Sequence, residues 1–589
     1  MSESLRASVA QWIEYDPNPV SRARVAALLE AEKFDELEKL FVPRIAFGTA
    51  GLRSRMDAGY KNMNELVVLQ ATQGLCTWMQ QEVPSAAERG VVIGYDGRHN
   101  SKTYAELTAA VLLSQGVRVY FFDQLVCTPL VPYGVLLKKA AAGVMVTASH
   151  NPKDDNGFKV YWSNGAQIIP PNDVGIAEAI QANLKPWHTD YKLDTTNPLF
   201  VDASAEIMDS YFGQISARYC RLREQNKAAA LKVTYTAMHG VGARYVTRAL
   251  AAFDLPPYIP TPEQVEPDPE FSTVAFPNPE EGKGALALAI KAADAAGSTV
   301  ILANDPDADR LAVAVKNTKT NEWVMLTGNE IAAVFAEWEW LQWRAANPDA
   351  DAGKCVMIAS TVSSKHLRAM AEAEGFTFRD TLTGFKWIGN EAIKAQAQGF
   401  TTLFAYEVEI GFLVGDVSFD KDGVRTAAVM YELANHWALQ GQSLLDRVAG
   451  FYNKYGHFKM VNSYVFCDAA SKLDAVFAEL CEPAYPTACG KFAIKSVRDV
   501  KRGIDTAQPD GKLVLPHMTD SYMVTFTFEN GATATLRNSG TEPKLKYYVE
   551  VSSKESPAAA EALLAEMTQA LVDNFIQPTK FGLIPKKAD

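Results

Sequence analysis

The residues best suited to carry out chemistry lie in a short polar stretch at residues 147–152. The stretch follows an apolar run at residues 141–146, which is rich in small and β-branched residues and predicts a buried strand. In open α/β sheets, ligands bind just beyond the carboxyl ends of the strands. Ser149 stands at that point beside His150, so its hydroxyl could act as a nucleophile. The alternative is a strand-to-helix turn in which Ser149 only caps the next element.

Three aspartates at alternate positions, Asp305, Asp307 and Asp309, follow a second apolar run at residues 299–303. Unpaired carboxylates this close would repel one another, so we expect a divalent cation between them. Ligation by oxygen alone selects Mg²⁺ or a similar hard ion. The pattern is not an EF-hand, because Arg310 stands where the invariant glycine belongs. The alternative is a solvated acidic turn.

Two further loops contain groups that bind phosphate. Residues 47–53 hold two glycines and end with Arg53, whose forked guanidinium fits a phosphate group. Residues 537–544 offer a guanidinium, two hydroxyls, an ammonium and glycine-exposed backbone N–H groups, which together suit a phosphate dianion. The residues expected to contact that dianion are Arg537, Ser539, Gly540, Thr541 and Lys544. For both loops the alternative is an ordinary surface turn.

The elements that must position these loops follow a regular alternation of short apolar runs and helical stretches. This alternation predicts βα units and a largely parallel sheet. Strands are expected at residues 91–93, 117–122, 141–146, 156–161, 233–236, 299–303, 356–359 and 402–406.

Other stretches read as helix, turn or loop. One amphipathic helix is expected at residues 17–42. Gly240 and Gly242 are interpreted as a tight strand-to-helix turn, because no third glycine or P-loop lysine follows. The proline-dense residues 256–282 predict an irregular loop.

The last part of the chain has a different pattern. Residues 522–528 alternate apolar and threonine side chains, Asn530 and Gly531 predict a hairpin turn, and the alternation resumes to Leu536. A strand at residues 545–551 and an amphipathic helix at residues 556–574 complete the segment. This arrangement predicts an antiparallel α+β domain.

Composition narrows the class of protein. The chain has 589 residues, 48% hydrophobic and 21% charged, which is typical of a globular protein of several domains. A net charge of −12 argues against a nucleic-acid or anionic-membrane partner. Seven scattered cysteines without metal spacing, no secretory signal and no membrane-spanning run predict a cytoplasmic protein with reduced thiols.

Taken together, these motifs favour phosphoryl transfer. A nucleophilic serine beside a hard cation fits a reaction in which catalysis is mostly positioning and charge neutralisation. A second phosphate site distinguishes a mutase from a phosphatase, because it could hold a phosphate already on the substrate while the far end of the molecule meets Ser149.

The same motifs resemble those of a known family, the α-D-phosphohexomutases. Residues 147–152 are similar to its phosphoserine loop and residues 305–310 to its metal loop, while residues 384–387 and 407–411 are similar to its sugar-recognition loops. The distal phosphate loop is matched by residues 537–541. The matches keep the family order across about residues 45–575. They most resemble the eukaryotic-type phosphopentomutase/phosphoglucomutase branch, which includes a glucose 1,6-bisphosphate synthase.

The resemblance implies a fold and a set of domains. It implies three α/β domains with mixed or parallel sheets and a C-terminal α+β domain of TATA-binding-protein-like shape, arranged around a central cleft. The boundaries expected are residues 1–205 with the phosphoserine loop, 206–345 with the metal loop, 346–457 with the sugar-recognition loops, and 458–589 with the distal phosphate loop.

The resemblance also implies roles for residues. Mg²⁺ would be held by Ser149, Asp305, Asp307 and Asp309, with Ser149 phosphorylated in the resting enzyme and a sugar 1,6- or 1,5-bisphosphate as intermediate. His150 and Lys159 would act as acid and base, and Arg53 and Arg310 would stabilise the transferring group. Besides the distal loop, the substrate contacts expected are Thr383, Gly384, Lys386, Glu407 and Glu409.

One position departs from the family pattern. The second sugar loop usually has Glu-x-Ser or a small residue, whereas this chain has Glu409 two residues after Glu407. A second carboxylate should weaken the binding of dianions unless it points away or accepts a hydrogen bond from a sugar hydroxyl.

The function predicted from the sequence is that of a Mg²⁺-dependent mutase. It would interconvert glucose 1-phosphate and glucose 6-phosphate, ribose 1-phosphate and ribose 5-phosphate, or both pairs. Two alternatives remain open: synthesis of glucose 1,6-bisphosphate from 1,3-bisphosphoglycerate, and a catalytically silent sugar-phosphate sensor. The partners expected are small sugar phosphates, without nucleic acid or membrane, and the sequence leaves the oligomeric state open.

Overall fold

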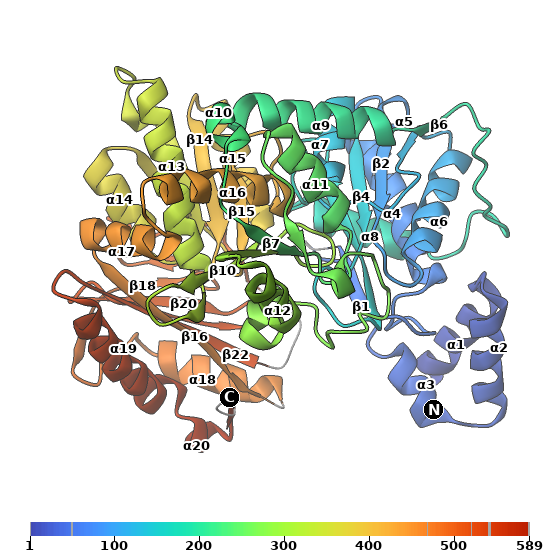
Figure 1. Ribbon diagram of the computed structural model, residues 1–589. Coiled ribbons are helices and arrows are strands. Elements are labelled where there is room, and N and C mark those ends of the chain that lie inside the picture. The colour runs from blue at the N-terminus through green and yellow to red at the C-terminus, as the bar shows by residue number, and fades with distance from the viewer. Residues whose placement is uncertain (1, 49–50, 468, 520, 540–543, 587–589) are drawn as a thin grey trace. The chain divides into compact units, whose positions relative to one another are not determined.

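A computed structural model describes residues 2–48, 51–467, 469–519, 521–539 and 544–586 (Figure 1). The chain forms two compact units. The first contains residues 1–358 and 384–445, and the second contains residues 359–383 and 446–589.

Three helices open the first unit: α1 (Glu3–Tyr15), α2 (Pro19–Glu30) and α3 (Phe34–Phe41). The single helix expected at residues 17–42 is therefore wrong. The chain turns between α2 and α3 at Glu32, whose φ of 53° is left-handed and cannot continue a helix. Trp12 is buried between Phe41 and Tyr60, with ring centroids at 5.7 and 5.1 Å.

A six-stranded mixed sheet carries the serine stretch. Its order is β1-β5-β4-β2-β3-β6, with parallel pairing among β4, β2, β3 and β6 and antiparallel pairing of β5 with both β4 and β1. The strands are β1 (Leu52–Arg55), β2 (Val91–Tyr95), β3 (Val119–Phe121), β4 (Ala142–Val146), β5 (Asp155–Trp162) and β6 (Phe200–Asp202).

Both faces of this sheet are covered, which explains why its central strands β2 and β4 are buried along their whole length. Val91 and Ile93 belong to the core formed with α4 and α6, whereas Gly94 and Gly143 contact side chains of α7 on the other face. The helices are α4 (Glu65–Glu82), α5 (Ala86–Arg89), α6 (Ser101–Ser114), α7 (Leu130–Lys138), α8 (Asn172–Ala182) and α9 (Ser204–Tyr219).

A second mixed sheet carries the aspartates. Its order is β11-β10-β9-β7-β8, and β7 pairs in parallel with β9. The strands are β7 (Val233–Thr236), β8 (Ile259–Pro260), β9 (Val300–Ala303), β10 (Ala312–Asn317) and β11 (Glu322–Met325). The surrounding helices are α10 (Arg223–Lys227), α11 (Gly242–Ala252) and α12 (Ala287–Ala296), with short 3₁₀ turns at Pro262–Gln264 and Pro279–Gly284.

The turn after β7 packs against the turn after β9. The N–H of Val241 donates to the carbonyl of Pro306 at 2.8 Å. A Cβ atom on Gly240 would lie 2.3 Å from Pro306 Cα, and one on Gly242 would lie 2.2 Å from the hydroxyl of Tyr235. The two glycines therefore form the expected strand-to-helix turn. Gly240 is needed because the aspartate loop lies directly against it, and Gly242 because the Tyr235 hydroxyl does.

The remainder of the first unit contains β12, β14 and β15 of a third sheet, in that order. Antiparallel pairing of β14 with β15 places Glu407 opposite Gly411. The strands are β12 (Cys355–Ser360), β14 (Thr401–Glu407) and β15 (Gly411–Val414), and the helices are α13 (Gly328–Ala346), α15 (Phe385–Ala397) and α16 (Gly423–Leu439).

The second unit is built on an antiparallel sheet, as the threonine alternation predicts. Its order is β17-β18-β20-β21-β22-β16-β23, with β19 beside β18. The hairpin of β20 and β21 turns at Gly531, whose φ is 82°. The strands are β16 (His457–Phe466), β17 (Ala488–Cys489), β18 (Phe492–Asp499), β19 (Ile504–Asp505), β20 (Met523–Phe528), β21 (Thr533–Asn538), β22 (Lys544–Ser553) and β23 (Ile584–Pro585).

Helices cover one face of this sheet, where Phe526 packs against Phe575 with ring centroids 4.9 Å apart. They are α18 (Ala470–Cys481), α19 (Pro557–Leu571), a π-helical turn at Val572–Ile576 and α20 (Pro578–Phe581). The unit also contains α14 (His366–Glu374), β13 (Thr377–Thr381) and most of α17 (Leu444–Tyr455).

The sheets confirm the predicted fold class of three α/β domains followed by an α+β domain. The four domain boundaries expected from the sequence stay predictions. Among the described residues, every helix is too short or too polar to cross a lipid bilayer.

Replacing Gly240 tests the packing of the two turns. The substitution Gly240→Ala forces its new Cβ into the backbone of Pro306, so we expect a loss of about 1–3 kcal/mol in stability. Gly213→Ala is the matched control, because Gly213 lies within α9 and a Cβ there meets no atom within 4 Å. Thermal unfolding should show a lower Tm for Gly240→Ala only; equal Tm values for the two variants would contradict the packing described.

Candidate functional site

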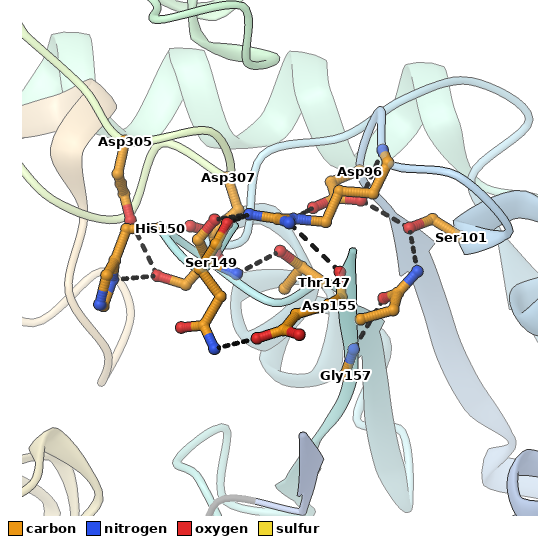
Figure 2. A network of polar contacts seen from close by, with 12 residues as sticks. Asp96, Ser101, Thr147, Ser149, His150, Asp155, Gly157, Asp305 and Asp307 are labelled. Carbon is orange, nitrogen blue, oxygen red and sulfur yellow. Dashed lines mark hydrogen bonds and ion pairs between the residues drawn. The ribbon is translucent and has the colours of Figure 1, made fainter. Parts of the chain in front are cut away.

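Ser149 lies in the turn that joins β4 to β5. Its φ is 53°, a left-handed conformation that costs a non-glycine residue about 1 kcal/mol or more. The N–H of Ser149 donates to Thr147 Oγ1 at 2.9 Å, which stabilises the turn (Figure 2). The side chain is almost fully buried. A strained, buried serine at the end of a central strand fits the predicted nucleophile better than a helix cap.

Arg98, which follows β2, holds this turn by its backbone. Its guanidinium donates to the carbonyl oxygens of Ser149 and Asn151, both at 2.6 Å, and to those of Pro152 at 2.8 Å and Asp155 at 3.2 Å. A planar fork with several donors suits this task in a way that lysine does not.

Asp96 in turn orients Arg98. The Arg98 Nε atom lies 3.3 Å from Asp96 Oδ2, and both side chains are buried. Ser101 donates to Asp96 Oδ1 at 2.6 Å (Figure 2). The sequence analysis did not identify this pair, although the D-G-R triplet at residues 96–98, shortly after the strand predicted at residues 91–93, was the available signal.

The three aspartates lie together in the turn after β9. One carboxylate oxygen from each lies within 4.8 Å of the others, and all three side chains are buried. Asn304 fixes the turn, because its amide donates to the carbonyl of Gly423 at 3.2 Å and its side-chain oxygen accepts from Tyr235 at 2.7 Å.

Ser149 reaches this cluster directly. Its Oγ donates to Asp305 Oδ2 at 2.9 Å (Figure 2), and Asp305 Oδ1 accepts from the N–H of Arg310 at 3.0 Å. Burial, together with the neighbouring charges of Asp307 and Asp309, raises the pKa of Asp305 well above its usual range. Nucleophile and carboxylates thus form one site.

Asp307 and Asp309 each accept hydrogen bonds at one carboxylate oxygen, whereas the other oxygen has no hydrogen-bond partner among the described residues. Asp307 Oδ2 accepts from Lys159 and from Thr128 Oγ1, both at 2.6 Å. Asp309 Oδ2 accepts from Lys159 at 2.9 Å and lies 3.3 Å from Lys421 Nζ. Within the part of the chain that the structure describes, Oδ1 of Asp307 and Oδ1 of Asp309 have no hydrogen-bond partner. Buried carboxylate oxygens of this kind fit a hard divalent cation, so the cluster could hold a metal.

His150 and Lys159, the predicted acid and base, both lie at the site. His150 Nδ1 is 3.2 Å from Ser149 Oγ, and burial, reinforced by Arg310 and Arg53, lowers the pKa of His150 well below its usual value. Burial also lowers the pKa of Lys159, but Asp307 and Asp309 more than offset this, and the net pKa is raised. The raised pKa favours the protonated form of Lys159.

The structure also brings the two predicted arginines to Ser149. Arg53 lies on β1 opposite Gly157 of β5, and its Nη1 donates to Asn151 Oδ1 at 3.3 Å. Arg310 Nε lies 4.0 Å from Asp305 Oδ2. The strand pairing of β1 with β5 is the link between the Arg53 loop and the serine turn.

The predicted sugar loops lie next to the aspartate turn. Gly384, with a φ of 104°, donates its N–H to Glu407 Oε1 at 2.6 Å, and Lys386 lies in the first turn of α15. Arg310 forms a β-bridge with Gly411, which joins the loop of Glu407 to the aspartates. Thr383, the last residue before Gly384, belongs to the second unit.

The two glutamates of this loop share a buried region. Burial, together with the charge of Glu409, raises the pKa of Glu407. Glu409 Oε2 is buried, and no hydrogen-bond partner for it exists among the described residues.

The predicted distal phosphate loop lies in the second unit, at the turn between β21 and β22. Arg537 donates to the Tyr548 hydroxyl at 3.1 Å, and Lys544 Nζ lies 4.3 Å from the ring centroid of Tyr464. The N–H of Ser539 donates to the carbonyl of Lys544 at 2.9 Å. Gly540 and Thr541, also predicted, lie outside the described residues.

Within the first unit, one cluster therefore contains Ser149, His150, Lys159, Arg53, Arg310, the three aspartates and the sugar loop that ends at Gly411. Besides Arg98 and Asp96, sequence reasoning missed Thr128 and Lys421. Thr128 stands in no recognisable motif, and Lys421 lies between two aspartates at Asp420 and Asp422 without an adjacent apolar strand.

Comparison with known proteins agrees with this fold. Three models of the phosphoglucomutase/phosphomannomutase family match the chain, namely alpha/beta/alpha domain I at residues 44–186, domain II at residues 209–319 and domain III at residues 327–455. The chain belongs to this family and is a phosphomutase enzyme.

Named relatives cover nearly the whole chain. A phosphopentomutase of Mus musculus is 44% identical over 100% of this chain and 97% of its own length. A glucose 1,6-bisphosphate synthase of Homo sapiens is also 44% identical, over 98% of this chain and 96% of its own. A phosphoribomutase of Saccharomyces cerevisiae is 38% identical over 99% and 98%.

Among solved structures, a phosphoglucomutase/phosphomannomutase family protein of Burkholderia thailandensis has a TM-score of 0.62 at 18% identity and covers 90% of this chain and 97% of its own. The Paramecium phosphoglucomutase parafusin has a TM-score of 0.63 at 15% identity and covers 92% and 96%. At these identities the likeness concerns the fold.

Thr128 provides a test of the cation site. Thr128→Val removes a 2.6 Å hydrogen bond to Asp307 Oδ2 and leaves that oxygen to Lys159, so the carboxylate is oriented less firmly. Loss of such an orienting contact typically weakens metal binding about 10- to 100-fold. Titration calorimetry with Mg²⁺ or Mn²⁺ on the apoprotein measures the change. Thr77→Val is the control, because the Thr77 hydroxyl donates to the carbonyl of Gln73 within α4. Equal affinities in the two variants would show that Thr128 does not orient a ligand.

Proposed function

We propose that this chain is a Mg²⁺-dependent sugar-phosphate mutase that works through phosphorylated Ser149. The observation that carries the proposal is the 2.9 Å contact of Ser149 Oγ with Asp305 Oδ2, inside a buried cluster of three carboxylates. A serine hydroxyl meets hard cation ligands in this way where phosphoryl groups are transferred.

The cation would be held by Asp305, Asp307 and Asp309, with Ser149 or its phosphate as a further ligand. Oxygen-only donors favour Mg²⁺ over softer metals. When bound, the cation neutralises charge on the phosphoryl oxygens. Lys159 and Thr128 fix the other oxygen of Asp307, so its free oxygen faces a defined position.

In the forward step, a sugar-phosphate hydroxyl attacks phosphorus, and the bond between phosphorus and Ser149 Oγ breaks. Arg53 and Arg310 stabilise the charge on the transferring group. His150, whose Nδ1 lies 3.2 Å from Ser149 Oγ, would take the proton that the sugar hydroxyl loses and deliver one to Ser149 Oγ as that oxygen leaves. Lys159, held as a cation, supplies positive charge and a proton donor.

The product of this step is a sugar 1,6- or 1,5-bisphosphate, which turns end for end and returns its other phosphoryl group to Ser149. The distal residues Arg537, Ser539, Gly540, Thr541 and Lys544 would hold the phosphate that is not reacting. Their guanidinium, hydroxyl and ammonium groups suit a dianion.

The substrates proposed are pentose and hexose phosphates. Relatives named phosphopentomutase and phosphoribomutase support ribose 1-phosphate and ribose 5-phosphate, and the family supports glucose 1-phosphate and glucose 6-phosphate. The sugar would be contacted by Thr383, Gly384, Lys386, Glu407 and Glu409. The proposed partners are these small molecules in the cytoplasm, without nucleic acid or membrane.

A second candidate activity has direct support. Relatives named glucose 1,6-bisphosphate synthase are as similar to this chain as the mutases are. In that reaction Ser149 would receive its phosphoryl group from 1,3-bisphosphoglycerate and pass it to a hexose monophosphate. Product analysis with and without that donor separates the two activities.

Ser149→Ala should abolish both activities, because the nucleophilic oxygen is lost. We expect turnover at least about a thousandfold lower with each sugar phosphate, and no phosphate on the protein by intact-mass analysis. Ser114→Ala, which removes a hydroxyl that donates to the carbonyl of Val111 within α6, is the control. Retention of turnover in Ser149→Ala would contradict a phosphoserine mechanism.

Glu409→Ala tests sugar selectivity. If the buried Oε2 of Glu409 accepts a hydrogen bond from a sugar hydroxyl, its removal should change the ratio of kcat/KM for ribose 1-phosphate to that for glucose 1-phosphate about tenfold or more. Glu409→Gln keeps an acceptor and should restore part of the ratio. The same ratio in wild type and both variants would mean that Glu409 plays no part in selectivity.

A further inference from the structure

A proline-rich loop of the first unit, residues 266–284, covers one side of the serine turn. We call it the covering loop. It follows the 3₁₀ turn Pro262–Gln264 and precedes α12. The sequence predicts an irregular loop here, yet it is firmly anchored: Phe271, Pro277, Asn278 and Pro279 are all buried.

The base of the covering loop is tied to His239. His239 has a φ of 60°, and its Nε2 lies 2.7 Å from Thr273 Oγ1. Its carbonyl accepts from the N–H of Asp268 at 2.9 Å, and the Asp268 carboxylate accepts from Ser272 Oγ at 2.6 Å. These bonds fold the loop into a fixed shape at the turn after β7.

The outer part of the covering loop contacts both sides of the serine turn. Glu270 lies 2.6 Å from His99 Nε2 and accepts from Lys153 Nζ at 2.6 Å. His99 directly follows Arg98, and Lys153 directly follows Pro152 at the end of the turn. The carboxylate of Glu270 therefore links the segment after β2 to the serine turn, the same two segments that the hydrogen bonds of Arg98 connect.

Aromatic rings complete the contact. The Arg98 guanidinium lies 4.9 Å from the ring centroid of Phe271. The ring of Phe276 meets the ring of His150 edge-on, with centroids 6.0 Å apart. Phe276 is 37% exposed, so it forms a boundary between His150 and solvent rather than part of the core.

A phosphoserine enzyme needs such a boundary. The phosphoryl group on Ser149 can be attacked by a sugar hydroxyl or by water, and every attack by water loses one phosphoryl group. Exclusion of water from a charged site is a recognised means of preventing this side reaction.

We propose that the covering loop, through Phe276 and Glu270, shields phosphorylated Ser149 from water and thereby makes the sugar hydroxyl the preferred acceptor. This inference rests on the function proposed above. The reaction suppressed is hydrolysis: a water oxygen bonds to phosphorus, the bond to Ser149 Oγ breaks, a water proton goes to Oγ, and inorganic phosphate leaves.

The experiment follows loss of phosphate from the enzyme in the absence of an acceptor. Full-length protein is phosphorylated with glucose 1,6-bisphosphate, desalted, and sampled by intact mass, with phosphate release measured in parallel. Phe276→Ala should lose its phosphate about tenfold faster than wild type, while kcat for the mutase reaction falls by a smaller factor. Glu270→Gln, which weakens the span between His99 and Lys153, should also accelerate the loss.

Matched controls keep the outcome decisive. Phe276→Leu keeps an apolar side chain at the boundary and should lose phosphate within about twofold of the wild-type rate. Leu439→Ala removes an exposed apolar side chain at the end of α16 and should have no effect. Folded Phe276→Ala and Glu270→Gln proteins that keep the wild-type rate would overturn the inference. Wild-type protein that takes up no phosphate on Ser149 would instead overturn the proposed function.

Discussion

The site depends on the burial of three carboxylates close to one another. Asp305, Asp307 and Asp309 are buried and within 4.8 Å of one another. Removing carboxylates from water costs several kcal/mol for each ion unless opposite charges and hydrogen bonds compensate. Lys159 and Lys421 supply part of that compensation. The cations come from β5 and from the segment before α16, so the aspartate turn can exist only where several sheets meet.

The loops around the aspartates also contain residues in strained backbone conformations. Ser149, Ala308 and Ile410 all have φ between 51° and 55°, a region that a β-branched residue such as Ile410 rarely adopts. Such conformations persist only where the surroundings hold them. Arg98 holds the serine turn in its conformation through four hydrogen bonds to carbonyl oxygens. The bridge of Arg310 with Gly411 stabilises the loop of Ile410.

Because of the buried charge and the backbone strain, some side chains near the site have a structural role and others can take part in chemistry. Rigid donors behind the site, Arg98 and Thr128, hold backbone and carboxylates in place and need not touch a substrate. In the proposed mechanism, Ser149 and His150 are the groups that exchange a phosphoryl group and a proton. The covering loop contacts the serine turn on one side, and in the proposal above this contact keeps water away from the phosphoryl group.

The sequence by itself determined the fold class, the strands before the serine and aspartate loops, and the clustering of the three aspartates, because each has a local signature: an apolar run followed by a polar turn. It also indicated Glu409 as a departure from the family. It could not show that Arg98, Thr128 and Lys421 converge on Ser149, Asp307 and Asp309, since those contacts span 51 to 179 residues. It also missed the break at Glu32 and gave Lys159 no charge state. Only the tertiary structure decided these, because a pKa and a hydrogen-bond partner depend on which groups the sheets bring together.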